Sequence, residues 1–159
     1  MIEGIYGFQG DYHFLSNMYR SPGCTIDSIP VPTNEHRYQA FKAMNAEGRN
    51  FVLYKDLTSP SDLSLFDPAK FTSAHEAKRR GRIIPSDKLW WEENKIYIML
   101  EGLKEKFSTP KLAEKLRATG DLYLEETNWW GDHFWGVCDG KGKNVLGLLL
   151  MQVRKELNN

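Results

Sequence analysis

The sequence lacks several features that define common classes of protein. It contains only two cysteines, Cys24 and Cys138, which form neither a disulfide framework nor a zinc-site spacing, and we interpret both as buried or partly buried thiols in a reducing compartment. No apolar run approaches the length of a membrane span, and the N-terminus has no signal-peptide pattern. These absences predict a cytoplasmic protein that does not interact with membranes.

The chain also lacks an excess of charge of either sign. Its 21 basic residues balance its 21 acidic residues, which gives no general attraction to nucleic acid but leaves room for a local basic patch. No histidines or cysteines are paired at metal-ligand spacing, the run Gly140–Lys143 does not have P-loop spacing, and no serine nucleophile elbow occurs. We therefore expect neither a catalytic metal nor a bound cofactor.

The length and the apolar content of the chain are sufficient for one folded domain covering residues 1–159. Of these residues, 41% are hydrophobic and 13% are aromatic, which predicts a well-filled interior. Short strands are expected at 2–8, 24–26, 29–31 and 121–126. Helices are expected at 34–47, 50–57, 74–80, 88–107, 110–120 and 145–157, the last as a core helix in which Gly147 allows close packing. Between them, 59–71 has turn signals at 59–62 and 67–68.

The helix expected at 34–47 carries the most informative polar residues. Thr33 or Asn34 is suited to cap its N-terminus, and Gly48 is suited to end it. Glu35, Gln39 and Lys42 are spaced i, i+4 and i+7, so at about 100° per residue they fall within roughly 60° of one another. The inward apolar face is expected to hold Ala40, Phe41, Ala43 and Met44. The polar stripe is either an ordinary solvated face or a functional acid, amide and amine.

Two other polar positions allow both a structural and a functional interpretation. Ser16 and Asn17 stand between apolar pairs, where they either form a turn through local hydrogen bonds or present the Asn17 amide to a polar ligand. The basic cluster at 78–82 ends a helix that Thr72 or Ser73 is suited to cap. It either complements the negative end of that helix or clamps phosphate through Arg80 and Arg82.

Aromatic residues gather in two places. Trp90 and Trp91 are adjacent in a helix capped by Ser86 or Asp87, so one is expected in the core and the other is expected to be free to stack on a ring. The apolar stripe of that helix is expected to comprise Leu89, Trp90, Ile96, Tyr97, Leu100, Leu103 and Phe107. The second place is the loop at 127–136, which brings tryptophans beside Glu125 and Asp132.

Together these regions supply the groups that a sugar-phosphate or nucleotide site needs. The central stripe supplies an acid and an amine, the aromatic loop supplies carboxylates beside stacking surfaces, and Arg80 and Arg82 supply phosphate ligands. The run 140–144 opens the last helix, whose N-terminal amides favour anions. Each region alone is a weak signal, and the combination is stronger.

A set of motifs in order along the chain resembles the NADAR family, also called YbiA-like. The motifs are Phe14-Leu15-Ser16-Asn17, Glu35-His36-x-x-Gln39-Ala40-x-Lys42-Ala43, Gly81-Arg82, Trp90 or Trp91, Asp132-x-x-Trp135-Gly136 and Gly142-x-Asn144-x-x-Gly147-x-x-Leu150-Met151-x-x-Arg154. The resemblance extends from Tyr6 to Leu157. No single motif is specific, but the ordered set is.

The resemblance implies a compact, mainly helical α+β domain with a few short strands. It also implies N-glycosidase activity on ribosylated bases. Two substrate classes are associated with the family: ADP-ribose attached to guanine in DNA or RNA, and ribosylamino-pyrimidine phosphates of the riboflavin pathway. The implied partners are therefore a small molecule, either ADP-ribose or a ribosyl phosphate, or DNA or RNA that carries ADP-ribose. A non-catalytic module that binds NAD or ADP-ribose is the alternative.

Carried over by motif, Glu35, Lys42 and Asp132 are the implied catalytic residues. The implied substrate-binding residues are Asn17, Gln39, Arg80, Arg82, Trp90, Trp91, Glu125, Trp135, Gly136 and Asn144. The extra pair Trp129-Trp130 leaves open whether Glu125 or Glu126 matches the family's acidic position.

Cleavage of a C1′–N bond needs a carboxylate to stabilise the cationic sugar, a role open to Glu35 or Asp132. Lys42 acts either as an ammonium that binds phosphate or ribose oxygens, or as a neutral amine that attacks C1′. The second role needs a lowered pKa, which the nearby Glu35 would oppose.

Overall fold

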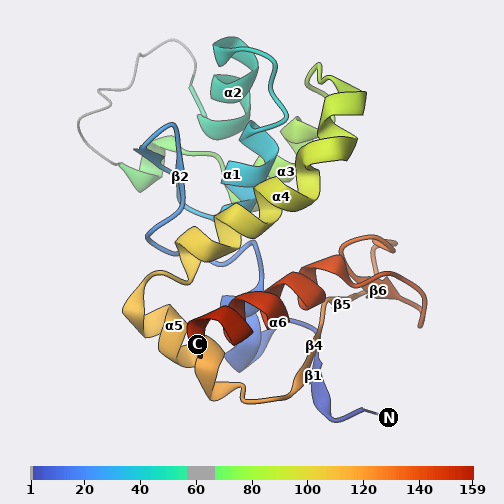
Figure 1. Cartoon of the computed structure of the whole chain (residues 1–159). Coiled ribbons are helices and arrows are strands. Elements are labelled where there is room, and N and C mark those ends of the chain that lie inside the picture. Colours follow the sequence, from blue (N-terminus) through green and yellow to red (C-terminus); the bar gives the residue numbers. More distant parts are fainter. Residues whose placement is uncertain (1, 57–66) are drawn as a thin grey trace. The chain divides into compact units, whose positions relative to one another are not determined.

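The computed structural model describes residues 2–56 and 67–159, and the turn signal predicted at 59–62 lies outside these ranges. The described chain is mainly helical with a few short strands, as expected (Figure 1). Its contacts divide it into two compact units, which we describe separately. Unit 1 comprises Met1–Tyr19 and Phe107–Asn159, and unit 2 comprises Arg20–Lys106.

Unit 2 is built around one short helix. Helix α1 (Asn34–Ala40) packs against α2 (Ala46–Leu53), α3 (Ala74–Gly81) and α4 (Lys88–Lys106). An antiparallel pair, β2 (Thr25–Ile26) and β3 (Ile29–Pro30), precedes it, and a 3-10 helix, η2 (Pro68–Lys70), leads into α3. The elements around α1 therefore come from both sides of it in the sequence.

Polar caps define where these helices begin. The Thr33 side chain accepts a hydrogen bond from the His36 amide, so Thr33 is the cap of α1. Asn45 caps α2 in the same way, and Ser73 caps α3. Asp87 accepts from the Trp90 amide at 3.0 Å at the start of α4. Each side chain satisfies an amide that has no partner within its own helix.

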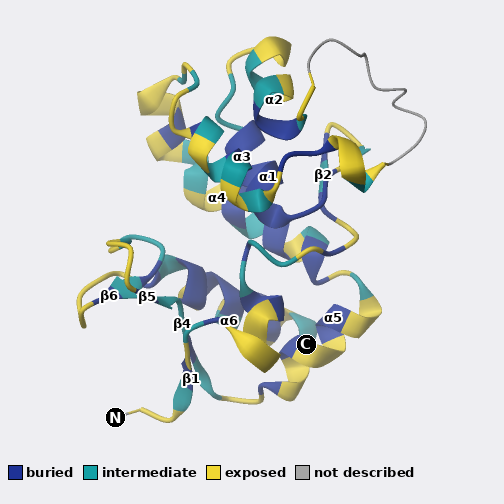
Figure 2. Cartoon of the chain, turned by 180° about the vertical axis from the view of Figure 1, so that it is seen from behind, coloured by how far each residue is buried: buried dark blue, intermediate teal, exposed yellow. Residues whose placement is uncertain are grey.

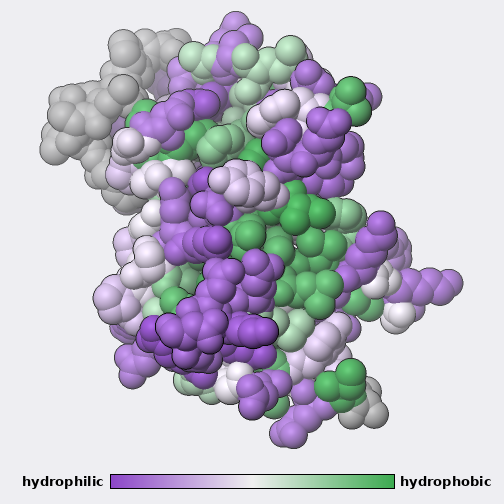
Figure 3. Space-filling model, viewed as in Figure 1, coloured by the Kyte–Doolittle hydropathy of each residue, from purple (hydrophilic) through white to green (hydrophobic). Residues whose placement is uncertain are grey.

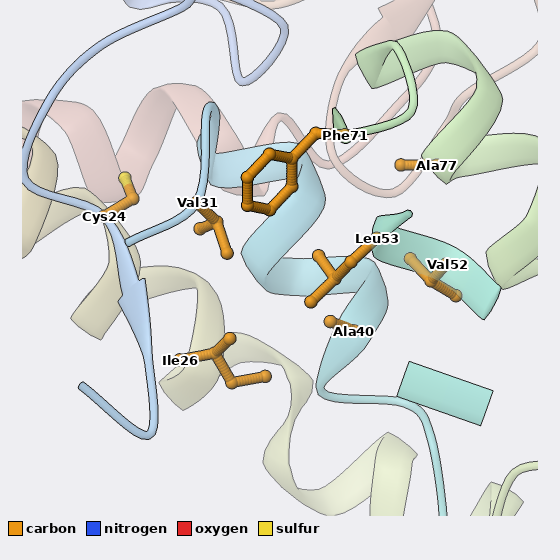
Figure 4. Packing of buried hydrophobic residues seen from close by; sticks show 8 residues of the cluster. All are labelled: Cys24, Ile26, Val31, Ala40, Val52, Leu53, Phe71 and Ala77. Carbon is orange, nitrogen blue, oxygen red and sulfur yellow. The ribbon is translucent and has the colours of Figure 1, made fainter. Parts of the chain in front are cut away.

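Every residue of α1 is buried, including its polar ones (Figure 2). Ala40 lies in a hydrophobic cluster drawn from several elements of unit 2 (Figure 4). The cluster comprises Cys24, Ile26, Val31, Ala40, Val52, Leu53, Phe71 and Ala77. Of the two alternatives for the polar stripe, the solvated face is therefore wrong for Glu35 and Gln39, because neighbouring helices cover both sides of α1.

The length of α1 also differs from the prediction. The helix ends at Ala40, where the amides of Lys42 and Ala43 bond to the carbonyls of Gln39 and Ala40 and tighten the chain into a turn. Asn45 then caps a new helix, so Gly48 lies inside α2 instead of ending α1. Met44, expected on the inward face, is 65% exposed in the turn between the helices.

Helix α4 has the predicted extent, but only part of the predicted apolar stripe is buried. Its buried residues are Trp91, Ile98, Met99, Gly102, Leu103 and Lys106. Leu89, Trp90, Ile96 and Tyr97 are exposed. The first half of the stripe was assigned to the wrong side because its apolar residues occur on more than one side of the helix.

Histidine 36 ties α1 to the segment before α3. Its Nδ1 lies 2.7 Å from the Thr33 hydroxyl, and its Nε2 lies 2.6 Å from the Thr72 carbonyl oxygen. The carbonyl can only accept, so Nε2 carries the proton and Nδ1 accepts from Thr33. Burial lowers the pKa of His36, and the bond to Thr72 only partly opposes this.

This lowered pKa predicts a loss of stability in acid. Below about pH 6.5 the unfolded chain binds a proton on His36 that the folded chain resists, so the free energy of unfolding falls as pH falls. Urea titrations between about pH 7.5 and about pH 5 should show this fall. The His36→Gln variant should be less stable and have a shallower pH dependence, while His75→Gln, at an exposed site, should follow the wild type. An unchanged slope in His36→Gln would contradict the assignment.

Unit 1 joins the two ends of the chain. Strand β1 (Gly4–Tyr6) pairs in parallel with β4 (Tyr123–Glu125), and β5 (Thr127–Asn128) pairs in parallel with β6 (Val137–Cys138). A 3-10 helix, η1 (Gly10–Leu15), follows β1, and α5 (Pro110–Ala118) precedes β4. Helix α6 (Val145–Leu157) packs against β4 and α5. The strands are shorter than predicted, and 127–136 contains β5 as well as loop.

The core position predicted for α6 is confirmed. Leu146, Leu149, Leu150 and Val153 are buried. A Cβ atom at Gly147 would lie 2.1 Å from the Leu124 carbonyl oxygen, so only glycine lets the helix lie this close to β4. Hydrophobic surface also gathers over the N-terminal half of α6, where Leu148 is exposed (Figure 3).

Both cysteines are free and buried, as expected. Burial raises the pKa of Cys24 to about 11, which makes its thiol a poor nucleophile. Among the described residues, no helix is both long and apolar enough to cross a membrane.

Candidate active site

A buried carboxylate and amide form the centre of the candidate site in unit 2. Glu35 and Gln39 lie one turn apart on α1, and the Gln39 Nε2 donates to Glu35 Oε1 at 2.7 Å. Both side chains belong to the buried part of the protein. A buried carboxylate is costly unless hydrogen bonds or charges compensate it, and the Gln39 amide supplies part of that compensation.

Lys42 lies in the turn after α1 and completes the predicted stripe. Burial lowers the pKa of its ammonium, and the opposing effect of Glu35 is the largest charge interaction on it. Burial outweighs Glu35, so the net change is a lowered pKa, the direction that the amine role needs. Its Nζ lies 5.6 Å from the ring centroid of Tyr38 and 5.4 Å from that of Trp91, which places the amine against aromatic faces.

Three cations near Lys42 add to this effect. Arg82, Lys78 and Lys95 each lower its pKa by repulsion. The basic cluster predicted at 78–82 contains Arg82 and Lys78, but Lys95 was missed. The spacing of Lys95 carried a signal, because it lies four residues after Trp91, as neighbours on one helix face do. This part of unit 2 therefore concentrates positive charge around one carboxylate.

The two adjacent tryptophans of α4 separate as predicted, one buried and one exposed. Trp91 is 8% exposed and packs on Tyr38 with ring centroids 4.8 Å apart. Trp90 is 44% exposed. Trp91 is thus the tryptophan that contacts the stripe, and Tyr38, which was not predicted, supports it.

Arg80 has a different environment from the one expected for a phosphate ligand. Its Nη1 donates to the carbonyl oxygens of Phe51 and Tyr54, and its Nε donates to Glu76. These bonds tie the C-terminal end of α2 to α3. Its guanidinium is therefore already engaged inside unit 2, whereas Arg82 is exposed.

The remaining predicted residues lie in unit 1, where Asp132 organises a turn. Its Oδ1 accepts from the amides of Phe134 and Trp135, and the Asn128 side chain bonds to the Asp132 backbone. A Cβ atom at Gly136 would lie 2.1 Å from the Glu126 carbonyl oxygen, so this glycine is required for close packing. Asp132 and Gly136 thus both shape the loop that carries Trp135.

Asn144 holds the start of α6 against β4. Its Oδ1 accepts from the Glu126 amide, and its Nδ2 donates to the Leu124 carbonyl and the Tyr123 hydroxyl. Its backbone is left-handed, with φ of 52°. These bonds give the predicted ligand-binding residue a structural role that the sequence did not reveal.

The other predicted positions of unit 1 are Asn17, Glu125 and Glu126. Asn17 is buried and follows Ser16, whose hydroxyl accepts from the Met18 amide in a local turn. Glu125 accepts from the Thr127 hydroxyl at 2.6 Å, while the Oε2 atom of Glu126 is buried. The extra aromatic pair, Trp129 and Trp130, is exposed.

The unit 2 groups can perform acid–base or covalent chemistry without a metal. Over residues 2–56 and 67–159, no group of three or more His, Cys, Asp or Glu side chains is arranged to hold a metal ion. A buried carboxylate can stabilise a cation, an amine of lowered pKa can act as a nucleophile, and the surrounding cations can bind an anion.

Comparison with known proteins is consistent with this chemistry. The NADAR domain family model matches residues 6–158. N-glycosidase YbiA of Escherichia coli is 30% identical, over 98% of this chain and 88% of that protein. A riboflavin biosynthesis protein of Vibrio vulnificus is 33% identical over 99% of this chain, and a maize chloroplastic one is 34% identical over 91%. The chain spans only 39% and 23% of the length of these two proteins.

The fold agrees with a solved structure. The NMR structure of E. coli YbiA matches with a TM-score of 0.74 and 31% identity, over 99% of this chain and 87% of that one. The chain therefore belongs to the NADAR domain family and is a homologue of the YbiA N-glycosidases.

Proposed function

We propose that this protein is an N-glycosidase that hydrolyses the C1′–N bond of a ribosylated base at the Glu35–Lys42 site. The observation that carries the proposal is an amine of lowered pKa, placed beside a buried carboxylate on the helix at the centre of unit 2. A module that only binds ADP-ribose needs cations and ring faces, but it does not need this carboxylate–lysine pair. The name of the YbiA relatives supports the same activity.

Glu35 is the group that faces the developing positive charge. When the bond to the base breaks, C1′ gains oxocarbenium character, which a nearby carboxylate stabilises. The hydrogen bond from Gln39 fixes the orientation of that carboxylate before the reaction. Asp132 remains the alternative carboxylate predicted from the family pattern.

Lys42 acts as the nucleophile in this proposal. Its neutral amine attacks C1′ with its lone pair, and the base leaves with the electrons of the C1′–N bond and takes up a proton. The C1′–O4′ bond then breaks, its electrons go to O4′, and an imine forms between C1′ and the Lys42 nitrogen. Of the two amine protons, one goes to the departing base and the other to O4′. Water hydrolyses the imine and returns the free lysine and the sugar. The pKa of Lys42 is lowered, which is the direction that a nucleophilic amine needs.

This proposal predicts a covalent adduct. Borohydride added during turnover should reduce the imine and add the mass of the sugar fragment to Lys42, as measured by mass spectrometry of peptides. Lys42→Arg, which keeps a charge but has no nucleophilic amine, should give no adduct, and Lys104→Arg, at an exposed site on α4, should give the wild-type adduct. An active enzyme that forms no adduct would rule out the imine route and leave the ammonium role.

The cations support a substrate that carries phosphate. Arg82, Lys78 and Lys95 act on Lys42 together, and arginine and lysine are common ligands of phosphate oxygens. As the first substrate we propose ADP-ribose attached to guanine in nucleic acid. The exposed ring of Trp90 in unit 2 supports it, since unpaired bases stack on such rings.

A ribosylamino-pyrimidine phosphate is the second candidate. The observation in its favour is that two relatives of this chain are named riboflavin biosynthesis proteins. Base release should be measured in parallel from DNA or RNA that carries ADP-ribosyl-guanine and from the pyrimidine phosphate. Release from one substrate alone assigns the class. Release from neither, with ADP-ribose still bound, would replace the glycosidase by a binding module.

A further inference from the structure

The C-terminal end of α3 lies against the Gln39 side chain at a glycine, Gly81. Gly81 is buried, and a Cβ atom built on it would lie 2.1 Å from Gln39 Oε1, 2.8 Å from Cδ and 3.0 Å from Cβ. All three separations are too short for non-bonded heavy atoms. No other amino acid fits at position 81 while Gln39 keeps its present conformation.

The conformation of Gln39 matters because its other amide atom bonds to Glu35. The Nε2 atom donates to Glu35 Oε1 at 2.7 Å, and only this end of the amide can donate to a carboxylate. The Oε1 atom therefore points away from Glu35 and lies against Gly81. Over the described residues this buried oxygen has no hydrogen-bond partner, so packing against the glycine holds it in place.

The same end of α3 also places two cationic side chains near Lys42. Arg82 follows Gly81 directly and Lys78 lies one turn before Arg82, and both lower the pKa of Lys42. A side chain at position 81 would have to displace either Gln39 or the end of α3. Either shift would alter the group that orients Glu35 or the cations that act on Lys42.

We propose that Gly81 is a positioning residue of the site: its missing side chain lets Gln39 hold the Glu35 carboxylate in its reactive orientation. This inference rests on the glycosidase proposal. Gly81 touches no reacting atom, and its effect passes through Gln39. Residues that orient metal ligands from behind are worth about 10- to 100-fold in activity, and we expect a loss of similar size here.

The experiment is a double-mutant cycle. Gly81→Ala should lower kcat by about 10- to 100-fold with a much smaller change in KM, because the orientation of Glu35 acts on the transition state. Gln39→Ala should lower kcat to a similar extent. Adding Gly81→Ala to Gln39→Ala should then cost much less, because the contacts with Oε1 at 2.1 Å and Cδ at 2.8 Å are gone and only the contact with the Cβ atom at 3.0 Å remains. Gly48→Ala, inside α2, is the glycine control: the nearest atom to its added Cβ is the Cβ atom of Ala43 at 3.3 Å, so it should keep wild-type kcat.

A second readout separates this inference from the glycosidase proposal. The side-chain amide of Gln39 gives its own signal in a nitrogen-15 NMR spectrum, which Gly81→Ala should move and Gly48→Ala should leave unchanged. Full kcat in Gly81→Ala, an equal loss of kcat in the Gln39→Ala background, or an unmoved Gln39 signal would overturn the positioning role. A wild type that releases no base would overturn the glycosidase proposal, and the Gln39 signal would still test the contact.

Discussion

Replacing Glu35 with glutamine is expected to lower kcat for base release by about 10²- to 10⁴-fold, the range typical of a lost catalytic carboxylate. The substitution keeps the shape of the side chain and removes its charge. The oxocarbenium ion then forms without an anion beside it. Substrate binding should change much less, because the cations that favour phosphate remain in place.

The fold should survive this change. A neutral amide at position 35 can still pair with Gln39 one turn away, and removing a buried charge spares its desolvation. A thermal midpoint within a few degrees of the wild type is therefore the expected accompaniment to the activity loss. If the thermal midpoint of the variant fell well below that of the wild type, the lower kcat would reflect unfolding and not the loss of the catalytic carboxylate.

Two further variants make the Glu35 test specific. Glu47→Gln, on the exposed face of α2, should keep full activity. Asp132→Asn tests the alternative carboxylate, whose Oδ1 is already engaged by two backbone amides. If Asp132→Asn lost base release while Glu35→Gln kept it with an intact fold, the two roles would have to be exchanged.

Replacing Asn144 with alanine is expected to lower the free energy of unfolding by about 3–5 kcal/mol. Three hydrogen bonds disappear, and the Glu126 amide and the Leu124 carbonyl lose a buried partner. Alanine must also adopt the left-handed conformation, with φ of 52°, which asparagine tolerates better. Urea unfolding measures the loss.

Asn144→Gly separates the two causes. Glycine adopts the left-handed conformation freely, so this variant should be about 1 kcal/mol more stable than Asn144→Ala while it lacks the same hydrogen bonds. Asn50→Ala, at an exposed position of α2, should cost much less than either. If both Asn144 variants kept wild-type stability but bound substrate poorly, the role of Asn144 would be to bind the ligand and not to stabilise the start of α6.

The helices of this chain were largely predictable because their signals are local. Capping side chains mark their starts, and the apolar residues of α6 mark its buried role. The end of α1 was not predictable in this way, because Asn45 caps a second helix only five residues after Ala40, within a stretch whose spacing suits one continuous helix. The burial of both faces of α1 was equally hidden, since it depends on helices distant in the sequence.

The central stripe was predictable for the same local reason. Glu35, Gln39 and Lys42 are related by helical spacing, so their proximity follows from α1 and the turn that continues it. The contributions of Lys78 and Lys95 depend on how α3 and α4 pack, and the engagement of Arg80 depends on the end of α2. A sequence displays the type of each side chain, whereas these roles depend on tertiary neighbours.

Helix α1 contains seven residues, fewer than an isolated helix needs in water. It therefore exists only while α2, α3 and α4 surround it, so its amide protons should exchange with deuterium only when unit 2 opens as a whole. The arrangement of the residues proposed to cleave the glycosidic bond would then be lost in one step. In this protein, loss of activity during gradual denaturation would report the opening of unit 2 directly.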